Sequence, residues 1–175
     1  MPKLKYLDSI TVEPSQINNL FRIFLNQLYV LSRSTPIPYE IAFDPEFHIL
    51  HLQIREENLY IQIEKQIEQL SSHIQSKKFE TFQIIFQLYK KDPSLKQSYI
   101  SNFFKIGSPK KQVIQEFLLH VTVTSQNKNS LYSNYDTKTA LKRKLAMLLK
   151  YIENNRDLFN KIENVSALAY IKNNY

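Results

Sequence analysis

Glycine occurs once in this chain of 175 residues, at Gly107. Phosphate-binding loops and dinucleotide-binding turns need several glycines, because a backbone without Cβ atoms lets a phosphate approach closely. The nucleophile elbow of hydrolases carries flanking glycines on a sharp turn, and Gly107-Ser108 lacks that pattern. The chain therefore cannot form nucleotide-binding or hydrolase folds of these types.

The spacing of apolar residues predicts alternating strands and helices. The clearest helix runs from Ser15 to about Ser32, where one apolar stripe recurs at spacings of three and four. A second helix is expected to begin near Arg55, and Asp136 or Thr137 can cap a last long helix whose buried face extends to Phe159. The predicted strands cover 4–12, 47–54, 79–89 and 113–124.

Two segments carry weaker signals. After the first helix, Pro36 and Pro38 are followed by a loop or edge segment through Asp44-Pro45. The first strand is suggested by alternate residues that share one phase, namely Leu4, Tyr6, Asp8, Ile10 and Val12.

The predicted order is strand, helix, strand, helix, two strands and helix, without an internal repeat. It indicates a mixed α+β fold with helices against one face of a sheet. A hydrophobic content of 43% and a charged content of 22% suit a single globular domain over 1–175. Asp8 is reached before any apolar run of signal-peptide length, so we expect a cytoplasmic protein.

No set of residues predicts catalysis or metal binding. The chain has no cysteine, which removes disulfides, thiolate nucleophiles and thiolate zinc sites. His48 and His51 would point to opposite faces of a strand, so they would not share a metal. Glu56-Glu57 is explained by the positive end of a helix. The sequence favours a protein that is not an enzyme and holds no metal or cofactor.

Two adjacent aromatic residues precede the glycine, between two predicted strands. Phe103, Phe104 and Ile106 lie on this segment, and Gly107 and Pro109 mark a turn. Apolar side chains on a surface loop usually mark a contact site. The alternative is that one phenylalanine folds back to cap the core. We interpret Phe103, Phe104 and Ile106 as a candidate partner-binding finger.

The net charge of +7 is concentrated partly around this finger. Lys105, Lys110 and Lys111 form a candidate basic contact surface there, and a second basic group covers 138–144. Lysine-rich surfaces with few arginines recognise the bases of nucleic acids poorly, because bidentate hydrogen bonds to guanine favour arginine. We therefore expect a solvated basic surface and no nucleic-acid partner.

A succession of short motifs carries a family resemblance. The motifs are the helix end 31–35, the passage Glu46-Phe47-His48-Ile49-Leu50-His51-Leu52-Gln53-Ile54-Arg55-Glu56-Glu57-Asn58-Leu59, the strand end Leu88-Tyr89-Lys90-Lys91, and the aromatic finger before His120-Val121-Thr122-Val123. Together they resemble the autophagy-related protein 101 family of HORMA-domain proteins. The resemblance implies a HORMA-like domain, a β-sheet backed by three α-helices, that acts as an adaptor without catalysis.

The resemblance also implies partners and a location. Members pair with and stabilise the HORMA domain of autophagy-related protein 13 within the autophagy-initiation kinase complex, which points to the cytoplasm and the phagophore assembly site. Their finger loop recruits downstream autophagy factors, and Phe103 and Phe104 occupy its place here. Residues 164–175 look too short to wrap a peptide. We expect 167–171 to add one strand in a single state similar to the open HORMA form.

Two alternatives remain open at this point. In the first, the chain is a peripheral membrane-binding module whose phenylalanine pair enters lipid while the surrounding lysines meet anionic headgroups. In the second, it is a HORMA adaptor that entraps a peptide.

Overall fold

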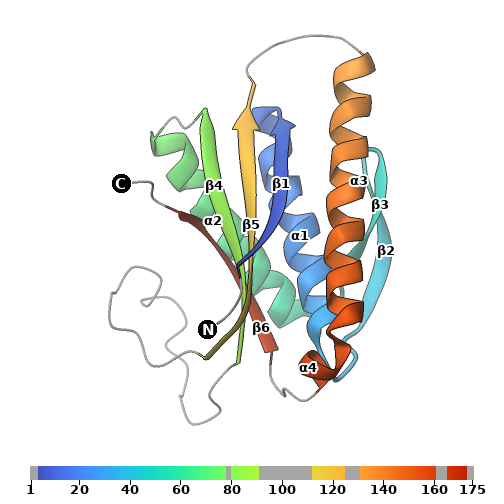
Figure 1. Ribbon diagram of the computed structural model, residues 1–175. Helices are drawn as coiled ribbons and strands as arrows, with labels where there is room; N and C mark the ends of the chain where they lie inside the picture. Colours follow the sequence, from blue (N-terminus) through green and yellow to red (C-terminus); the bar gives the residue numbers. More distant parts are fainter. Residues whose placement is uncertain (1–3, 78–79, 91–111, 125–130, 161–164, 173–175) are drawn as a thin grey trace.

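The computed structural model describes residues 4–77, 80–90, 112–124, 131–160 and 165–172, and of residues 131–135 it describes the backbone alone. It confirms the mixed α+β class (Figure 1). The elements in chain order are β1 (Leu4–Val12), the 3-10 turn η1 (Pro14–Gln16), α1 (Ile17–Ser32), β2 (Tyr39–Asp44), β3 (Ile49–Ile54), α2 (Glu57–Lys77), β4 (Thr81–Lys90), β5 (Gln112–Val123), α3 (Leu131–Asn154), α4 (Arg156–Asn160) and β6 (Val165–Lys172).

Four strands form one mixed sheet in the order β1-β5-β4-β6. β1 runs parallel to β5, while β4 is antiparallel to both β5 and β6. β6 confirms the strand predicted over 167–171. β2 and β3 pair antiparallel as a separate two-stranded hairpin.

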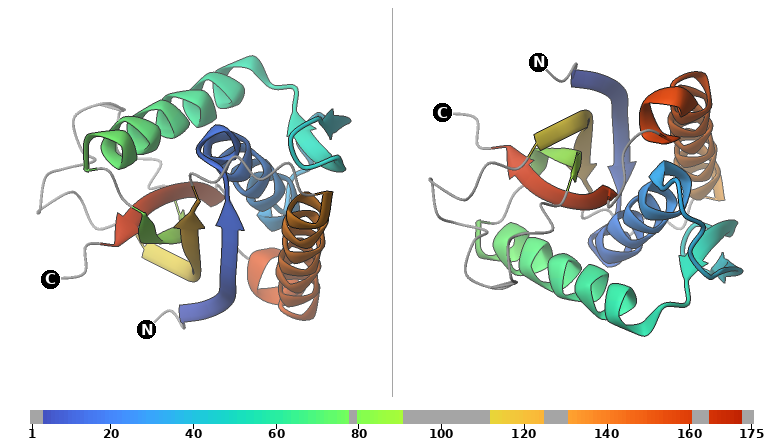
Figure 2. Two further views of the ribbon diagram at one scale, coloured as in Figure 1. Left: turned by 90° about the horizontal axis from the view of Figure 1, so that it is seen from above. Right: turned by 90° about the horizontal axis from the view of Figure 1, so that it is seen from below.

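α1 lies between the sheet and the hairpin (Figure 2). Its Phe24 ring stacks on Phe86 of β4 with centroids 5.0 Å apart, and its Phe21 ring meets Phe82 edge-on at 6.4 Å. α2 packs on α1 and β6, and α3 packs on β1 and α1. The predicted helix is thus buried against a sheet as expected, and it carries the hairpin on its other side.

The predicted phase of β1 is wrong at Tyr6 and Asp8, although it holds at Ile10 and Val12. Leu7, Ile10 and Val12 face the core, whereas Tyr6 and Asp8 are exposed. The pairing with β5 shifts register between Tyr6 and Ser9, and Asp8 takes a left-handed φ of 72°. Such a bulge changes which face each following side chain occupies.

The predicted limits of the last helix are also wrong. α3 begins at Leu131, so neither Asp136 nor Thr137 caps it, and it ends at Asn154. Asn155 donates from Nδ2 to the Tyr151 carbonyl at 2.8 Å, and a short asparagine side chain bonded to the backbone disfavours continued helix. Phe159 is buried on the separate helix α4.

Helix side chains occupy backbone groups at both edges of the sheet. At the β6 edge, the Gln66 amide of α2 donates to the Ala167 carbonyl at 3.4 Å and accepts from the Ala169 N–H at 3.3 Å. At the β1 edge, the Thr137 hydroxyl of α3 donates to the Thr11 carbonyl at 3.1 Å. Unpaired edge groups are the usual template for an added strand, so these contacts oppose strand addition there.

Candidate interaction surface

The hairpin forms around a short turn with a side-chain acceptor. Asp44 Oδ1 accepts a hydrogen bond from the Phe47 N–H at 2.8 Å, as aspartate does where it starts a turn. His48 then takes a left-handed φ of 50° before β3 begins. The segment expected as a loop or edge through Asp44-Pro45 therefore contains the strand β2 and its turn.

One face of the hairpin is apolar and exposed. Cross-strand partners on it include Ile41 with Leu52 and Phe43 with Leu50, pairs that lie about 5 Å apart on a sheet. We call this surface the hairpin face, and its large exposed side chains are Tyr39 (51%), Ile41 (68%), Phe43 (58%) and Leu50 (68%). Contiguous apolar side chains on a surface usually mark a contact site for another protein.

The other side of the hairpin is anchored on α1. Ile49 and His51 of β3 are buried. Asn26 of α1 accepts from the Ile54 N–H at 2.8 Å through Oδ1 and donates from Nδ2 to the Arg22 carbonyl at 2.8 Å. A buried amide with both ends bonded holds a surface in one position. The hairpin face is therefore presented by a fixed element.

The hairpin segment is acidic in sequence. Residues 39–54 contain Glu40, Asp44 and Glu46 and no lysine or arginine, in a chain whose net charge is +7. Glu40 has one basic neighbour, Arg55, whose Nε lies 3.6 Å from the Glu40 carboxylate. Glu40 lies on the side of β2 opposite Ile41 and Asp44 is buried, so the hairpin face itself is apolar and the exposed carboxylates Glu40 and Glu46 lie away from its apolar side chains.

A polar cluster lies on the sheet face turned away from α1. Glu116 Oε1 accepts from the Gln87 amide at 2.8 Å and from the Tyr170 hydroxyl at 3.2 Å. Burial and the neighbouring Glu116 carboxylate raise the pKa of Tyr170 to about 12. A phenol that is so hard to ionise stays protonated near neutral pH and cannot serve there as a base.

Lys144 does not belong to the solvated basic surface in which the sequence places it. Its side chain is buried between α3 and β1, with Nζ 3.7 Å from the Asp8 carboxylate. Burial lowers the pKa of Lys144, and Asp8 partly opposes that shift. Lys142 and Arg143 are exposed as predicted.

The predicted finger lies outside the described residues. This applies to its apolar residues and to the basic residues around it, namely Phe103, Phe104, Ile106, Lys105, Lys110 and Lys111. The candidate interaction surface that the structure shows is the hairpin face, which was not predicted from the sequence. The available signal was the alternation of Tyr39, Ile41 and Phe43 with polar or small residues.

Within the described ranges, no group of three or more histidine, aspartate or glutamate side chains could hold a metal ion. His48 is exposed in the turn and His51 is buried on β3, so the two are not presented together. The described helices also include none that is long and apolar enough to cross a membrane.

Comparison with known proteins identifies no family. No protein-family model matches the chain, and no curated protein sequence matches it either. Support for a function therefore comes from the fold and from the surfaces described above.

Proposed function

We propose that this chain is a non-catalytic HORMA-like adaptor that docks onto a partner domain through its hairpin face. The observation that carries the proposal is the exposure of Ile41, Phe43 and Leu50 on an element whose other side is fixed to α1. Apolar side chains held in place, at little further loss of conformational entropy, suit the centre of a protein interface.

The architecture supports the HORMA class. A HORMA domain is a β-sheet backed by three helices, and here α1, α2 and α3 pack beside the four-stranded sheet. The C-terminal strand β6 lies along β4, with the Gln66 amide and the Tyr29 hydroxyl bonded to its backbone. These buried bonds favour one state of the C-terminal strand over a switching one.

The proposed occupant of the hairpin face is the HORMA domain of autophagy-related protein 13. Docking through a face suits a folded partner, because helix side chains already bond to backbone groups at both edges of the main sheet. The exposed carboxylates of the hairpin segment, Glu40 and Glu46, suit a partner that has an apolar contact surface and basic side chains near it. In this proposal the pair belongs to the autophagy-initiation kinase complex at the phagophore assembly site.

Within the same proposal, the finger residues Phe103 and Phe104 recruit downstream autophagy factors. The residues on either side of the segment, Lys90 and Gln112, pair with each other at the end of β4 and β5. The hairpin lies across α1 from that sheet (Figure 2). Two separate surfaces would let one adaptor hold its HORMA partner and a further factor at once.

The test is co-purification of the full chain with the partner HORMA domain. The double variant Ile41→Ser with Leu50→Ser should lose binding by about 30-fold or more per site, because truncating a central contact residue costs about 2 kcal/mol or more. The matched control is Ile61→Ser with Leu158→Ser, which changes exposed apolar residues on α2 and α4.

Partner docking and membrane binding predict different experimental results. Wild-type affinity in the hairpin double variant, with an unchanged thermal melt, would contradict the proposal. Strong and salt-sensitive flotation of the isolated chain with anionic vesicles would favour the membrane-binding alternative instead. The lack of lysine and arginine in residues 39–54 favours a protein over an anionic membrane at this face.

A further inference from the structure

The hairpin has one edge that no described element covers. Its β3 edge faces α1, because the Ile54 N–H donates to Asn26 Oδ1 on that helix at 2.8 Å. Among the described residues, β2 packs extensively on β3 alone, and its exposed side chains include Glu40 and Ile41 from opposite faces of the strand. Figure 2 shows the hairpin across α1 from the main sheet. Within the described part of the chain, the β2 edge is therefore open to solvent.

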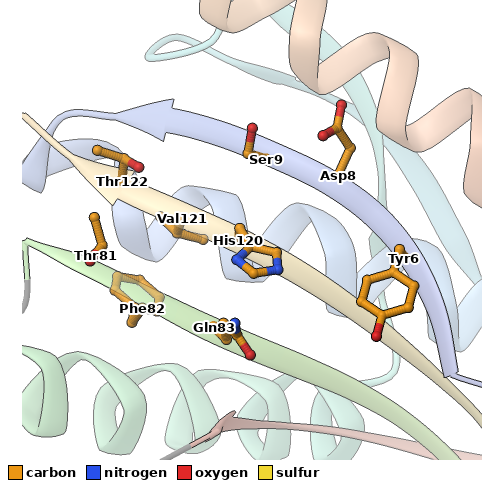
Figure 3. A pocket seen from close by; sticks show the side chains of 9 residues that line it. All are labelled: Tyr6, Asp8, Ser9, Thr81, Phe82, Gln83, His120, Val121 and Thr122. Carbon is orange, nitrogen blue, oxygen red and sulfur yellow. The ribbon is translucent and has the colours of Figure 1, made fainter. Parts of the chain in front are cut away.

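The two edges of the main sheet are covered instead. Figure 3, a view of the hollow over β1, β5 and β4, shows Asp8 directed from β1 toward α3, where Lys144 Nζ lies 3.7 Å from the Asp8 carboxylate. Thr137 of the same helix bonds to the Thr11 carbonyl, and Gln66 of α2 occupies backbone groups of β6. Of these three edges, β2 offers the one at which a further strand can pair.

The backbone groups on the open edge of β2 belong to alternate residues. The Arg55 N–H donates to the Pro38 carbonyl at 3.0 Å, so these two residues are bonded between the strands. Bonded and non-bonded pairs alternate along an antiparallel ladder, and the neighbouring pair contains Ile54, whose N–H points away from β2 to α1. The residues of β2 whose N–H and C=O groups point away from β3 are therefore Tyr39, Ile41 and Phe43.

We propose that a second copy of this chain pairs with this edge, so that two β2 strands lie antiparallel around a two-fold axis at Ile41. In this register, Ile41 lies opposite Ile41 of the second copy, and Tyr39 lies opposite Phe43. The outward groups then form about six N–H···O=C bonds between the copies. This pairing leaves the hairpin face uncovered, so it goes beyond the docking proposed above and does not rest on it.

The sequence of β2 is complementary to itself in this register. On the side of the hairpin face, tyrosine lies opposite phenylalanine twice and isoleucine lies opposite isoleucine once, and these are favourable cross-strand pairs. On the other side, Glu40 lies opposite Ala42 of the second copy. No two like charges therefore lie directly opposite each other.

The neighbouring registers fit less well. A shift by one residue would set outward groups against groups already bonded to β3, and would turn the two hairpin faces to opposite sides of the sheet. A shift by two residues would bring Glu40 opposite Glu40 of the second copy in one direction, and opposite Asp44 in the other. Like charges directly opposite each other destabilise a strand pair, so the register centred on Ile41 is favoured.

The charge of the chain gives self-pairing a characteristic dependence on salt. Both the whole chain, at +7, and residues 39–54, at −3, carry charge of the same sign in the two copies. The copies therefore repel each other, and added salt screens this repulsion. Self-pairing should strengthen as salt rises, whereas docking of a basic partner should weaken.

The first test is sedimentation of the full chain over a concentration series up to about 1 mM, because small interfaces are weak. The chain has no cysteine, so Ile41→Cys gives a single thiol. Cα atoms of a bonded antiparallel pair lie about 5.5 Å apart, within the range of a disulfide. The control is Leu50→Cys, since Leu50 is as exposed as Ile41 (68% each) but lies on β3. We expect at least about 10-fold more cross-linked dimer from Ile41→Cys.

Charge substitutions test the register. Ala42→Glu places a carboxylate opposite Glu40 of the second copy on both sides of the axis, and should weaken self-pairing about 10-fold. Ala42→Lys is the matched variant and should strengthen self-pairing several-fold, because it faces the same carboxylate. Glu40→Lys with Ala42→Glu should restore it. This rescue separates a lost interface from a misfolded hairpin.

Three results would overturn the proposal. The first is a monomer at every concentration with equal cross-linking of Ile41→Cys and Leu50→Cys, and the second is the same effect of Ala42→Glu and Ala42→Lys. The third is protection of the Ile41 amide from hydrogen exchange only when the partner HORMA domain is bound, which would assign the edge to a strand of that partner. Ala42 lies on the side of β2 opposite the hairpin face, so both Ala42 variants should co-purify normally with that domain. Failure of self-pairing and failure of partner docking are therefore distinguishable.

Discussion

Tyr170 shows how burial, together with a contact to the Glu116 carboxylate, sets the pKa of a single residue. Below about pH 10, the phenol is protonated in both the folded and the unfolded chain. Between about pH 10 and the folded pKa of about 12, the unfolded chain loses this proton while the folded chain keeps it. The contribution of Tyr170 to stability is therefore complete below this window and is lost as the pH rises through it.

Glu116→Gln should lower the pKa of Tyr170 without returning it to 10. The substitution removes the carboxylate that opposes phenolate formation, while burial, the larger cause, remains. The measurement is an NMR pH titration of tyrosine labelled at the ring Cζ, with Tyr170→Phe to assign the signal. Glu153→Gln on exposed α3 surface is the control, and an unchanged midpoint in Glu116→Gln would show that the carboxylate has no effect.

At the scale of elements, a strong period of two in the sequence correctly predicted which side chains of β4 are buried. Phe82, Ile84, Phe86 and Leu88 share a phase in the sequence and are all buried on β4. The strand β2 was not predicted for two reasons. Its alternating apolar residues are exposed to solvent, and the prolines around it are typical of a loop. The residues of the hairpin face on β2 could therefore not be recognised from the sequence. Their exposure follows from the contacts that fix the other side of the hairpin to α1.

The bulge in β1 could not be predicted from the sequence, for a different reason. A period of two cannot reveal one inserted residue, and the phase of β1 depends on its pairing with β5, more than a hundred residues later. The buried position of Lys144 follows from the same pairing, because α3 packs on β1. Both features depend on tertiary contacts that local patterns do not encode.

Asn26→Ala should loosen the hairpin from α1. The change leaves the buried Ile54 N–H without its acceptor and removes the bond to the Arg22 carbonyl, so we expect a loss of about 1–3 kcal/mol in the free energy of unfolding. Urea denaturation gives the loss, and hydrogen exchange at the Ile54 amide should become faster. Gln69→Ala, on the exposed side of α2, should change stability by less than about 0.5 kcal/mol. An Asn26 variant as stable as this control would contradict the anchoring role.

At the scale of the whole molecule, the finger and the hairpin face should act independently. Phe103→Ala with Phe104→Ala should leave folding nearly intact and abolish recruitment of a downstream factor. A surface change alters stability by less than about 0.5 kcal/mol, whereas truncating a buried phenylalanine costs about 3–5 kcal/mol. One thermal melt and one pull-down separate the cases, since a loss of several kcal/mol per site would place the pair in the core.

The distribution of charge leads to a kinetic prediction for partner docking. Glu40, Asp44 and Glu46 give residues 39–54 a formal charge of −3, so the rest of the chain carries +10 when the total is +7. A partner with basic side chains around its contact surface would be attracted to this face and repelled elsewhere, which raises its association rate at low salt. Glu40→Lys with Glu46→Lys reverses that local field, while Asp44 is left in place because it is buried in the turn.

The double reversal should slow association with the partner HORMA domain several-fold at low salt and weaken the dependence of the rate on salt, with a smaller effect on dissociation. Stopped-flow measurement at two salt concentrations gives both rates. Glu153→Lys with Asp157→Lys adds the same charge on α3 and α4 and is the control for net charge alone. Equal slowing by both pairs would mean that the total charge sets the rate, and that the carboxylates of the hairpin segment do not guide the partner.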